Sequence, residues 1–87
     1  MAEYRLFIKP SAAKEIEAIG TKTDRHRIVA RIRALAEDPR SKGAEKLAGH
    51  EDRYRVRQGR YRIVYLIEDE RREITVYKVG RRKDVYR

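Results

Sequence analysis

The 87-residue sequence contains no cysteine, which excludes disulfide bonds and thiolate metal sites without determining the redox compartment. It also lacks a long apolar run, since the N-terminal MAEYRLFIKP carries charges at Glu3, Arg5 and Lys9. We therefore expect neither a signal peptide nor a membrane span, with the cytoplasm as the default location. The chain has no internal repeat and no low-complexity segment, and its length suits one modest core. The sequence predicts a single domain over residues 1–87.

The motifs of several enzyme classes are missing as well. His26 and His50 are far apart, and the chain has no HExxH, no CxxC and no carboxylate cluster at metal-ligand spacing. It has no glycine loop for phosphate binding, and His50 has no positional support as a general base. The acidic run Glu68, Asp69 and Glu70 lies between two expected strands, which favours a solvated turn. We therefore predict no cofactor and no metal.

Positive charge is what the sequence has in excess. The chain holds 23 Lys and Arg against 14 Asp and Glu, a formal net charge of +9. Residues 53–87 contain 12 basic and 5 acidic residues, a net +7, so the excess belongs to the C-terminal part. A compact basic domain usually binds nucleic acid, with anionic membranes and acidic proteins as competing partners. Arginine predominates in this part, and its planar fork holds phosphate and stacks on bases, which favours nucleic acid.

Apolar spacing predicts a strand and then a short helix at the start of the chain. Apolar residues alternate over positions 4–8, which is typical of a strand with one well-buried face, and Pro10 ends it. Ser11 is the expected N-cap of the helix, and Gly20 is its expected left-handed C-cap residue. Between them, an apolar stripe recurs at helical spacing.

A second, longer helix follows. Thr23 or Asp24 is the expected N-cap, and Asp38-Pro39 ends the helix because proline disfavours helical geometry in the residue before it. A polar connection over residues 40–46 leads to the most strand-like part of the chain. The apolar stripe of the second helix consists of Ile28, Val29, Ile32, Leu35 and Ala36.

The segment RYRVRQGRYRIVYLIE, residues 53–68, combines strand periodicity with clustered arginines. It predicts a hairpin that reverses at Gln58-Gly59, and the inner half of its second strand is expected to be buried on both faces. Arg55, Arg57 and Arg62 converge if they share a face, which depends on the register. Such a cluster needs an anionic partner.

A further strand, residues 74–79, follows a polar turn at residues 69–72. Strict alternation there places Thr75, Tyr77 and Val79 on one side. Three strands joined by short turns form an antiparallel meander, and two helices are available to cover one of its faces. We therefore predict a small α+β domain in which an N-terminal strand and helical hairpin pack on an antiparallel meander. The opposite sheet face is left to the arginines.

The residues from Leu47 onward resemble the C-terminal half of toxins of the RelE/ParE superfamily from type II toxin-antitoxin modules, and the preceding strand and helix pair match the family order. The resemblance implies a RelE-like fold for nearly the whole chain. Members of this superfamily include ribosome-dependent mRNA endonucleases and inhibitors of DNA gyrase. The most specific matching segments are Leu47-Ala48-Gly49, Tyr54-Arg55-Val56-Arg57, Gly59-Arg60-Tyr61-Arg62-Ile63-Val64-Tyr65 and Val79-Gly80-Arg81-Arg82 with Val85-Tyr86.

The RelE branch carries two basic residues before the turn, an Arg after it, an Arg just beyond the last strand and a Tyr near the C-terminus. The resemblance thus implies a toxin that is a metal-independent, ribosome-dependent mRNA endonuclease and inhibits translation. Its implied partners are a cognate antitoxin protein and mRNA in the ribosome, with no membrane and no small-molecule cofactor. A ParE-like gyrase inhibitor and a non-catalytic basic RNA-binding or ribosome-binding module are the alternatives. The implied catalytic residues are Arg55, Arg57, Arg62, Arg82 and Tyr86.

Arg55 and Arg57 stand where well-known RelE toxins have lysines. Arginine stays protonated in proteins, so the general base must be another residue. Tyr86 is one candidate, because a nearby arginine cluster favours the tyrosinate and lowers a pKa that is ordinarily about 10. Alternatively, the Tyr86 ring stacks on an mRNA base and orients the substrate. Arg82 is expected to neutralise the leaving 5′-oxygen.

Overall fold

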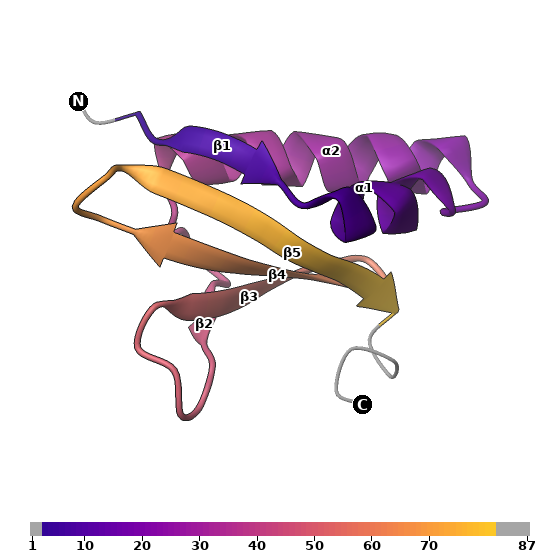
Figure 1. Ribbon diagram of the computed structural model, residues 1–87. Coiled ribbons are helices and arrows are strands. Elements are labelled where there is room, and N and C mark those ends of the chain that lie inside the picture. Colours follow the sequence, from indigo (N-terminus) through magenta and orange to yellow (C-terminus); the bar gives the residue numbers. More distant parts are fainter. Residues whose placement is uncertain (1–2, 82–87) are drawn as a thin grey trace.

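The structure is a computed structural model that describes residues 3–81. Two helices and five strands follow one another in a single compact unit (Figure 1). In chain order the elements are β1 (Arg5–Ile8), α1 (Pro10–Glu17), α2 (Lys22–Glu37), β2 (Glu45–Lys46), β3 (Arg53–Gln58), β4 (Tyr61–Glu68) and β5 (Glu73–Arg81).

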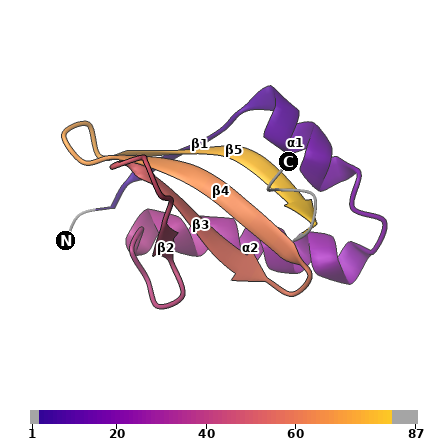
Figure 2. The same ribbon diagram turned by 90° about the horizontal axis from the view of Figure 1, so that it is seen from below.

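The strands form one sheet in the order β1-β5-β4-β3-β2. β1 runs parallel to β5, and all the other neighbouring strands are antiparallel. Both helices lie on one side of the sheet, so the view from below looks onto the strands with α2 behind them (Figure 2). This arrangement confirms the predicted α+β fold, in which a strand and two helices pack on an antiparallel meander.

α1 begins two residues earlier than its sequence indicates. Pro10 is the first helical residue and Lys9 the N-cap, so the prediction of Ser11 as the N-cap was wrong. Proline suits this position because its φ is already helical and its missing N–H would have no helical partner there. The helix ends with Ala18 as C-cap, and the prediction of a left-handed Gly20 was also wrong, because the positive-φ glycines within residues 3–81 lie elsewhere.

α2 contributes an apolar stripe that packs on the sheet. Its N-cap is Thr21, earlier than the predicted Thr23 or Asp24, and Asp24 instead lies in the first turn, where a carboxylate interacts favourably with the helix dipole. The predicted end at Asp38-Pro39 is confirmed, since Asp38 is the C-cap. The buried residues of the helix are Ile28, Ile32 and Leu35.

The core lies between the helices and the inner face of β3, β4 and β5. β4 is the central strand of the sheet, and its residues 62–65 are all buried, which confirms that its inner half is covered on both faces. The largest fully buried side chain is that of Tyr65. Its sheet neighbours in the core are Val56, Ile63, Ile67, Ile74, Val76 and Val79.

The alternation of β5 is interrupted by a β-bulge. Val64 pairs with Lys78, whereas the next residue, Tyr65, pairs with Val76, so Tyr77 is the extra residue. One extra residue reverses the faces beyond it, and Val79 therefore joins the core with Val76. The prediction that Val79 shares a face with Tyr77 was wrong because it assumed strict alternation.

The two edge strands depart from the sequence expectation. β1 has no well-buried face, because Leu6 is half-buried while Phe7 and Ile8 are 46% and 41% exposed. An edge strand has a neighbour on one side only, which leaves such side chains uncovered. On the opposite edge, Glu45 and Lys46 pair with β3 as a short strand within the segment expected to be a connection.

An ionic cluster joins the N-terminus, the segment after α2 and the β4–β5 turn. Arg40 donates two hydrogen bonds to the Asp69 carboxylate, at 3.1 and 2.8 Å, and the Tyr4 hydroxyl donates a third at 2.7 Å. The hydrogen bonds from Arg40 and Tyr4 lower the pKa of Asp69 to about 2. Asp69 is exposed, as a turn residue should be, but it is a specific tertiary contact rather than a purely solvated charge.

The same region holds a buried tyrosine that ties α2 to the sheet. The Tyr65 hydroxyl donates a 2.7 Å hydrogen bond to the backbone carbonyl of Pro39, which directly follows the C-cap of α2. Burial raises the pKa of Tyr65 to about 12. Its ring stacks on that of Tyr54, whose hydroxyl accepts a 3.1 Å hydrogen bond from Arg40 Nε. Tyr54 therefore links this contact to the ionic cluster.

Candidate nucleic-acid interface

The β3–β4 hairpin carries the predicted arginine cluster. Gln58 is still paired with Tyr61, so the reversal consists of Gly59 and Arg60, one residue later than expected. Gly59 has a φ of 61°, a left-handed conformation that glycine adopts without a steric penalty. The short turn sets the register of both strands, because it leaves no room for slippage.

This register brings the three hairpin arginines onto the sheet face opposite the helices. Val56 pairs with Ile63, and both point into the core, so the next pair, Arg57 with Arg62, points the other way. Arg55 lies two residues before Arg57 and shares its face. The structure thus brings Arg55, Arg57 and Arg62 together, which the sequence left open.

Arg57 and Arg62 form a like-charged pair at directly opposite positions. Arg57 is exposed, whereas Arg62 is only 4% exposed and is the one buried charged residue within residues 3–81. On its other side Arg62 pairs with Gly80, which has no side chain to occupy the space beside it. Two guanidinium groups at directly opposite positions together offer a phosphate several charged hydrogen-bond donors. The pair is therefore suited to phosphate.

Arg55 is oriented by an acidic neighbour from the edge strand. Its Nε donates a 3.1 Å hydrogen bond to Glu45 Oε1, and the two residues are paired between β2 and β3. The arginine side chain is 25% exposed and that of Glu45 53%. This ion pair directs the Arg55 side chain. Arg82 and Tyr86, the remaining predicted site residues, lie outside the described residues.

The rest of the same face carries residues that the sequence reasoning did not single out as a site. The Arg53 guanidinium carbon lies 5.3 Å from the centroid of the Tyr77 ring. Arg53 follows the same alternation as Arg55 and Arg57, and that signal could have found it. Tyr77 could not be paired with it from sequence, because the two strands are not neighbours in the sheet. A hollow of about 270 Å³ beside them is lined by Lys9, Arg53, Leu66, Thr75 and Tyr77.

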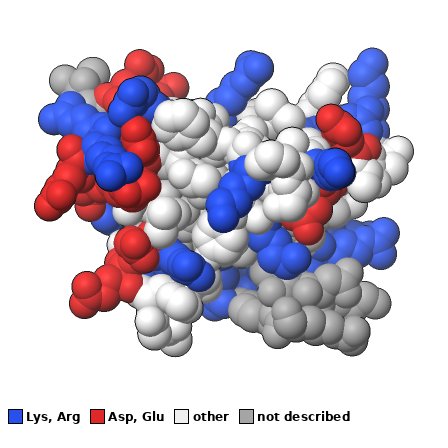
Figure 3. Space-filling model, viewed as in Figure 1, with Lys and Arg blue, Asp and Glu red and all other residues white. Residues whose placement is uncertain are grey.

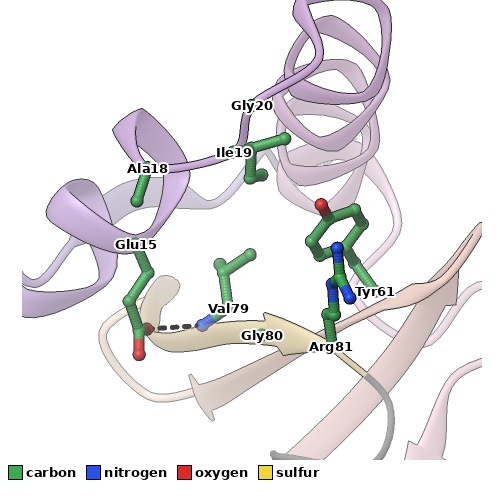
Figure 4. Close-up of a pocket in the computed structure, with 8 residues that line it drawn as sticks. All are labelled: Glu15, Ala18, Ile19, Gly20, Tyr61, Val79, Gly80 and Arg81. Atoms are coloured by element: carbon green, nitrogen blue, oxygen red, sulfur yellow. Dashed lines mark hydrogen bonds between the residues drawn. The ribbon is translucent and has the colours of Figure 1, made fainter.

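A second hollow, of about 290 Å³, lies on the helix side at the end of β5 (Figure 4). Glu15 of α1 accepts a 2.8 Å hydrogen bond from the Val79 backbone N–H, and its other oxygen lies 3.4 Å from Lys78 Nζ. β1 pairs only with the first part of β5, so Glu15 satisfies a backbone group that no strand reaches. The lining residues are Glu15, Ala18, Ile19, Gly20, Tyr61, Val79, Gly80 and Arg81.

Charge is unevenly distributed over the surface. Most of the acidic side chains visible in Figure 3 gather at the left end, over the β4–β5 turn, with basic ones among them, and further basic side chains extend over the centre and the right of the view. Within residues 3–81, no three His, Asp or Glu side chains are grouped to hold a metal ion. Neither described helix has the length and apolarity to cross a membrane. Arginine side chains are therefore the main functional groups of the open sheet face within residues 3–81.

Residues 6–86 match the family model described as the ParE toxin of the type II toxin-antitoxin system, parDE. A search of curated proteins gave no significant match. Fold and sequence together define a RelE-like toxin domain. The chain belongs to the ParE toxin family, within the RelE/ParE superfamily of type II toxin-antitoxin modules.

Several solved structures share the fold. The free form of an arginine-to-alanine double variant of E. coli RelE is 31% identical, with a TM-score of 0.80, covering 97% of this chain and 90% of that one. The same RelE variant bound to an antitoxin RelB peptide is 33% identical, with a TM-score of 0.77 and coverages of 99% and 92%. The archaeal RelE-RelB complex from Pyrococcus horikoshii is 28% identical, with a TM-score of 0.79 and coverages of 92% and 96%.

Proposed function

We propose that this toxin is a metal-independent endoribonuclease that cleaves mRNA on the ribosome and thereby inhibits translation in the cytoplasm. The observation that carries the proposal is the direct pairing of Arg57 with the buried Arg62, with Arg55 on the same face. Similarity to RelE at about 30% identity supports the same activity. Arg82 and Tyr86 complete the proposed site through the family resemblance.

The proposed reaction is an in-line attack of a ribose 2′-hydroxyl on the adjacent phosphate. The 2′-oxygen bonds to phosphorus as its proton passes to a base, and the bond from phosphorus to the 5′-oxygen breaks as that oxygen gains a proton. Negative charge builds on the phosphoryl oxygens, where Arg57 and Arg62 stabilise it. Burial makes Arg62 effective in this role, because its charge acts in a medium of lower dielectric constant than water.

Arginine stays protonated, so it cannot be the base, and its high pKa makes it a poor acid; the leaving 5′-oxygen takes its proton from solvent water. Tyr86 is the proposed base or the ring that stacks on an mRNA base, and Arg82 is proposed to neutralise the leaving oxygen. The products are a 2′,3′-cyclic phosphate and a 5′-hydroxyl end. Mapping mRNA ends after induction tests the proposal directly. Cleavage of translated mRNA with these ends is expected, and unchanged mRNA during growth arrest would refute it.

Inhibition of DNA gyrase is the second candidate, because the matching family model is that of the ParE toxin. A supercoiling assay with purified protein separates the two activities. Gyrase inhibition with intact mRNA would select this candidate. Ribosome binding without cleavage or gyrase inhibition, equally strong in Tyr86→Phe and wild type, would indicate a non-catalytic binding module.

A cognate antitoxin is the proposed protein partner. Solved relatives include RelE bound to RelB, and the net charge of +9 on this chain favours an acidic partner. A partner that binds only the folded toxin raises its apparent stability. The product of the neighbouring open reading frame should copurify with the toxin, raise its melting temperature and block cleavage. If that product neither copurifies nor relieves toxicity, the antitoxin proposal fails independently of the nuclease proposal.

A further inference from the structure

The open face of the sheet is organised in rows that run across the strands. The first row contains Arg57, Arg62 and Gly80, and the second contains Arg55 and Val64 with Lys78. The third row runs through Arg53, Leu66, Thr75 and Phe7, which pair successively across β3, β4, β5 and β1. The hollow of about 270 Å³ lies over this third row.

The hollow combines the groups that hold a nucleotide in a single strand. Tyr77 offers an aromatic ring and Leu66 an apolar surface, and both are only partly buried. Arg53 and Lys9 are exposed cations at the same hollow, and none of its five lining residues is acidic. Bases stack on aromatic rings and on guanidinium planes, while adjacent cations attract the phosphate.

The next row marks where this basic surface ends. Glu68 pairs with Glu73, and Glu73 forms an ion pair with Arg5 of β1. With two carboxylates and one arginine, this row attracts a phosphate less than the rows before it. From Arg53 to Arg57 the surface spans five residues of β3, and the four steps between them cover about 13 Å at strand spacing. The hollow is thus the last binding position before an acidic boundary.

We propose that the hollow lined by Lys9, Arg53, Leu66, Thr75 and Tyr77 is a nucleotide subsite, which takes one unpaired base and its phosphate from the RNA strand held at Arg57 and Arg62. The inference rests on the proposed function and extends its site to a neighbouring nucleotide. Charge complementarity and continuity along the same two strands favour RNA as the occupant. An acidic peptide would also meet the cations, but it would not need the planar surface formed by Arg53 and Tyr77.

Binding of RNA that cannot be cut tests the subsite. The probe is a fluorescein-labelled hexamer of 2′-O-methyl RNA, in which the attacking oxygen is blocked, together with a series carrying one abasic residue at each position. Full-length wild type, Tyr77→Leu and Tyr77→Phe are compared by fluorescence anisotropy. One abasic position should weaken wild-type binding about 5-fold or more, the size of a lost base stack. Tyr77→Leu should bind the intact hexamer about as weakly, and an abasic residue at that position should not weaken its binding further. Tyr77→Phe, which keeps the ring, should bind as wild type does.

The cationic part of the subsite has a charge-matched control. Arg53→Gln should weaken binding and reduce the salt dependence by about one phosphate contact, whereas Arg27→Gln, exposed on α2, should do neither. Thermal melting checks that each variant is folded. Because Arg53 is exposed, Arg53→Gln should fold and can test the subsite even if Tyr77→Leu does not fold.

Several outcomes would overturn the subsite. The subsite is refuted if the wild-type protein does not bind the hexamer. It is also refuted if the abasic effects persist unchanged in folded Tyr77→Leu, or if Arg53→Gln binds the hexamer as Arg27→Gln does. Loss of binding to the copurifying antitoxin in these variants, with RNA binding intact, would instead assign the hollow to a protein partner. Because the probe cannot be cut, these results are separate from mapping of mRNA ends. If mRNA is cleaved but the effect of the abasic position does not depend on Tyr77, only the subsite is refuted. If that effect depends on Tyr77 but mRNA is not cleaved, only the nuclease proposal is refuted.

Discussion

Arg57 and Arg62 occupy directly opposite positions on β3 and β4, and both point away from the core. Each guanidinium group is a planar, always charged fork of donors that matches the oxygens of a phosphate. Their pairing concentrates positive charge on one face of the hairpin, which suits a phosphate group.

Arg62 should matter more for the chemical step than for RNA binding. It is held in the central strand, and a site on a strand is positioned more precisely than one on a loop. Arg62→Ala is expected to lower the single-turnover cleavage rate on saturating ribosomes by about 10² or more. Arg60→Ala, in the exposed hairpin turn, is the matched control and should retain the rate. A loss of affinity with an unchanged saturated rate would show that Arg62 only positions RNA.

Asp69 should make the fold sensitive to acid. Its pKa is about 2 in the folded chain and 3.8 ordinarily, so its contribution to stability is present above about pH 4 and is lost as the pH falls toward 2. Asp69→Asn should lower the melting temperature at pH 7 and flatten its decline over that range. Melting curves of both proteins from pH 2 to 7 provide the measurement. Glu70→Gln, in the same turn, is the control, and parallel acid profiles for wild type and Asp69→Asn would contradict the prediction.

Tyr65 should make the fold sensitive to alkali. Its pKa rises from 10.0 to about 12 on folding, so the unfolded chain loses the proton first and stability falls as the pH rises through 10 toward 12. Tyr65→Phe should flatten this decline. At pH 7 it should cost roughly 1 to 3 kcal/mol, because the Pro39 carbonyl loses its 2.7 Å hydrogen bond. Urea unfolding of both proteins at pH 7 and 11 measures these effects. If wild type and Tyr65→Phe lose the same free energy of unfolding between pH 7 and 11, the predicted flatter decline is refuted.

Glu15 should hold the end of β5 through the Val79 N–H. Glu15→Ala is expected to speed hydrogen exchange of the Val79 amide and to cost roughly 1 kcal/mol of stability. Glu15→Gln keeps a carbonyl oxygen at the same place and should preserve most of the protection. Exchange followed by NMR distinguishes the two variants. If Val79 stays equally protected in Glu15→Ala, another group must satisfy this amide.

Local patterns in the sequence were sufficient to predict most of the secondary structure and the fold class. The two-residue period of 53–68 and the glycine at position 59 predicted the hairpin, and the helical stripe ending at Asp38-Pro39 predicted α2. These features are decided within a few residues, by which side chains must leave water and by which backbone angles glycine and proline allow. The helix starts were misplaced because several neighbouring residues were acceptable caps, and the observed caps make no side-chain hydrogen bond.

The sequence by itself therefore determined the α+β class, the hairpin and the presence of arginines on a sheet face opposite the helices. Only the tertiary structure decided that Arg57 faces Arg62, that a bulge turns Val79 into the core, and that Arg53 meets Tyr77 across the face. The same holds for Arg40 and Asp69, which are 29 residues apart. Each of these contacts joins segments whose relative position depends on strand register and packing, and a one-residue shift would remove it without altering any local pattern.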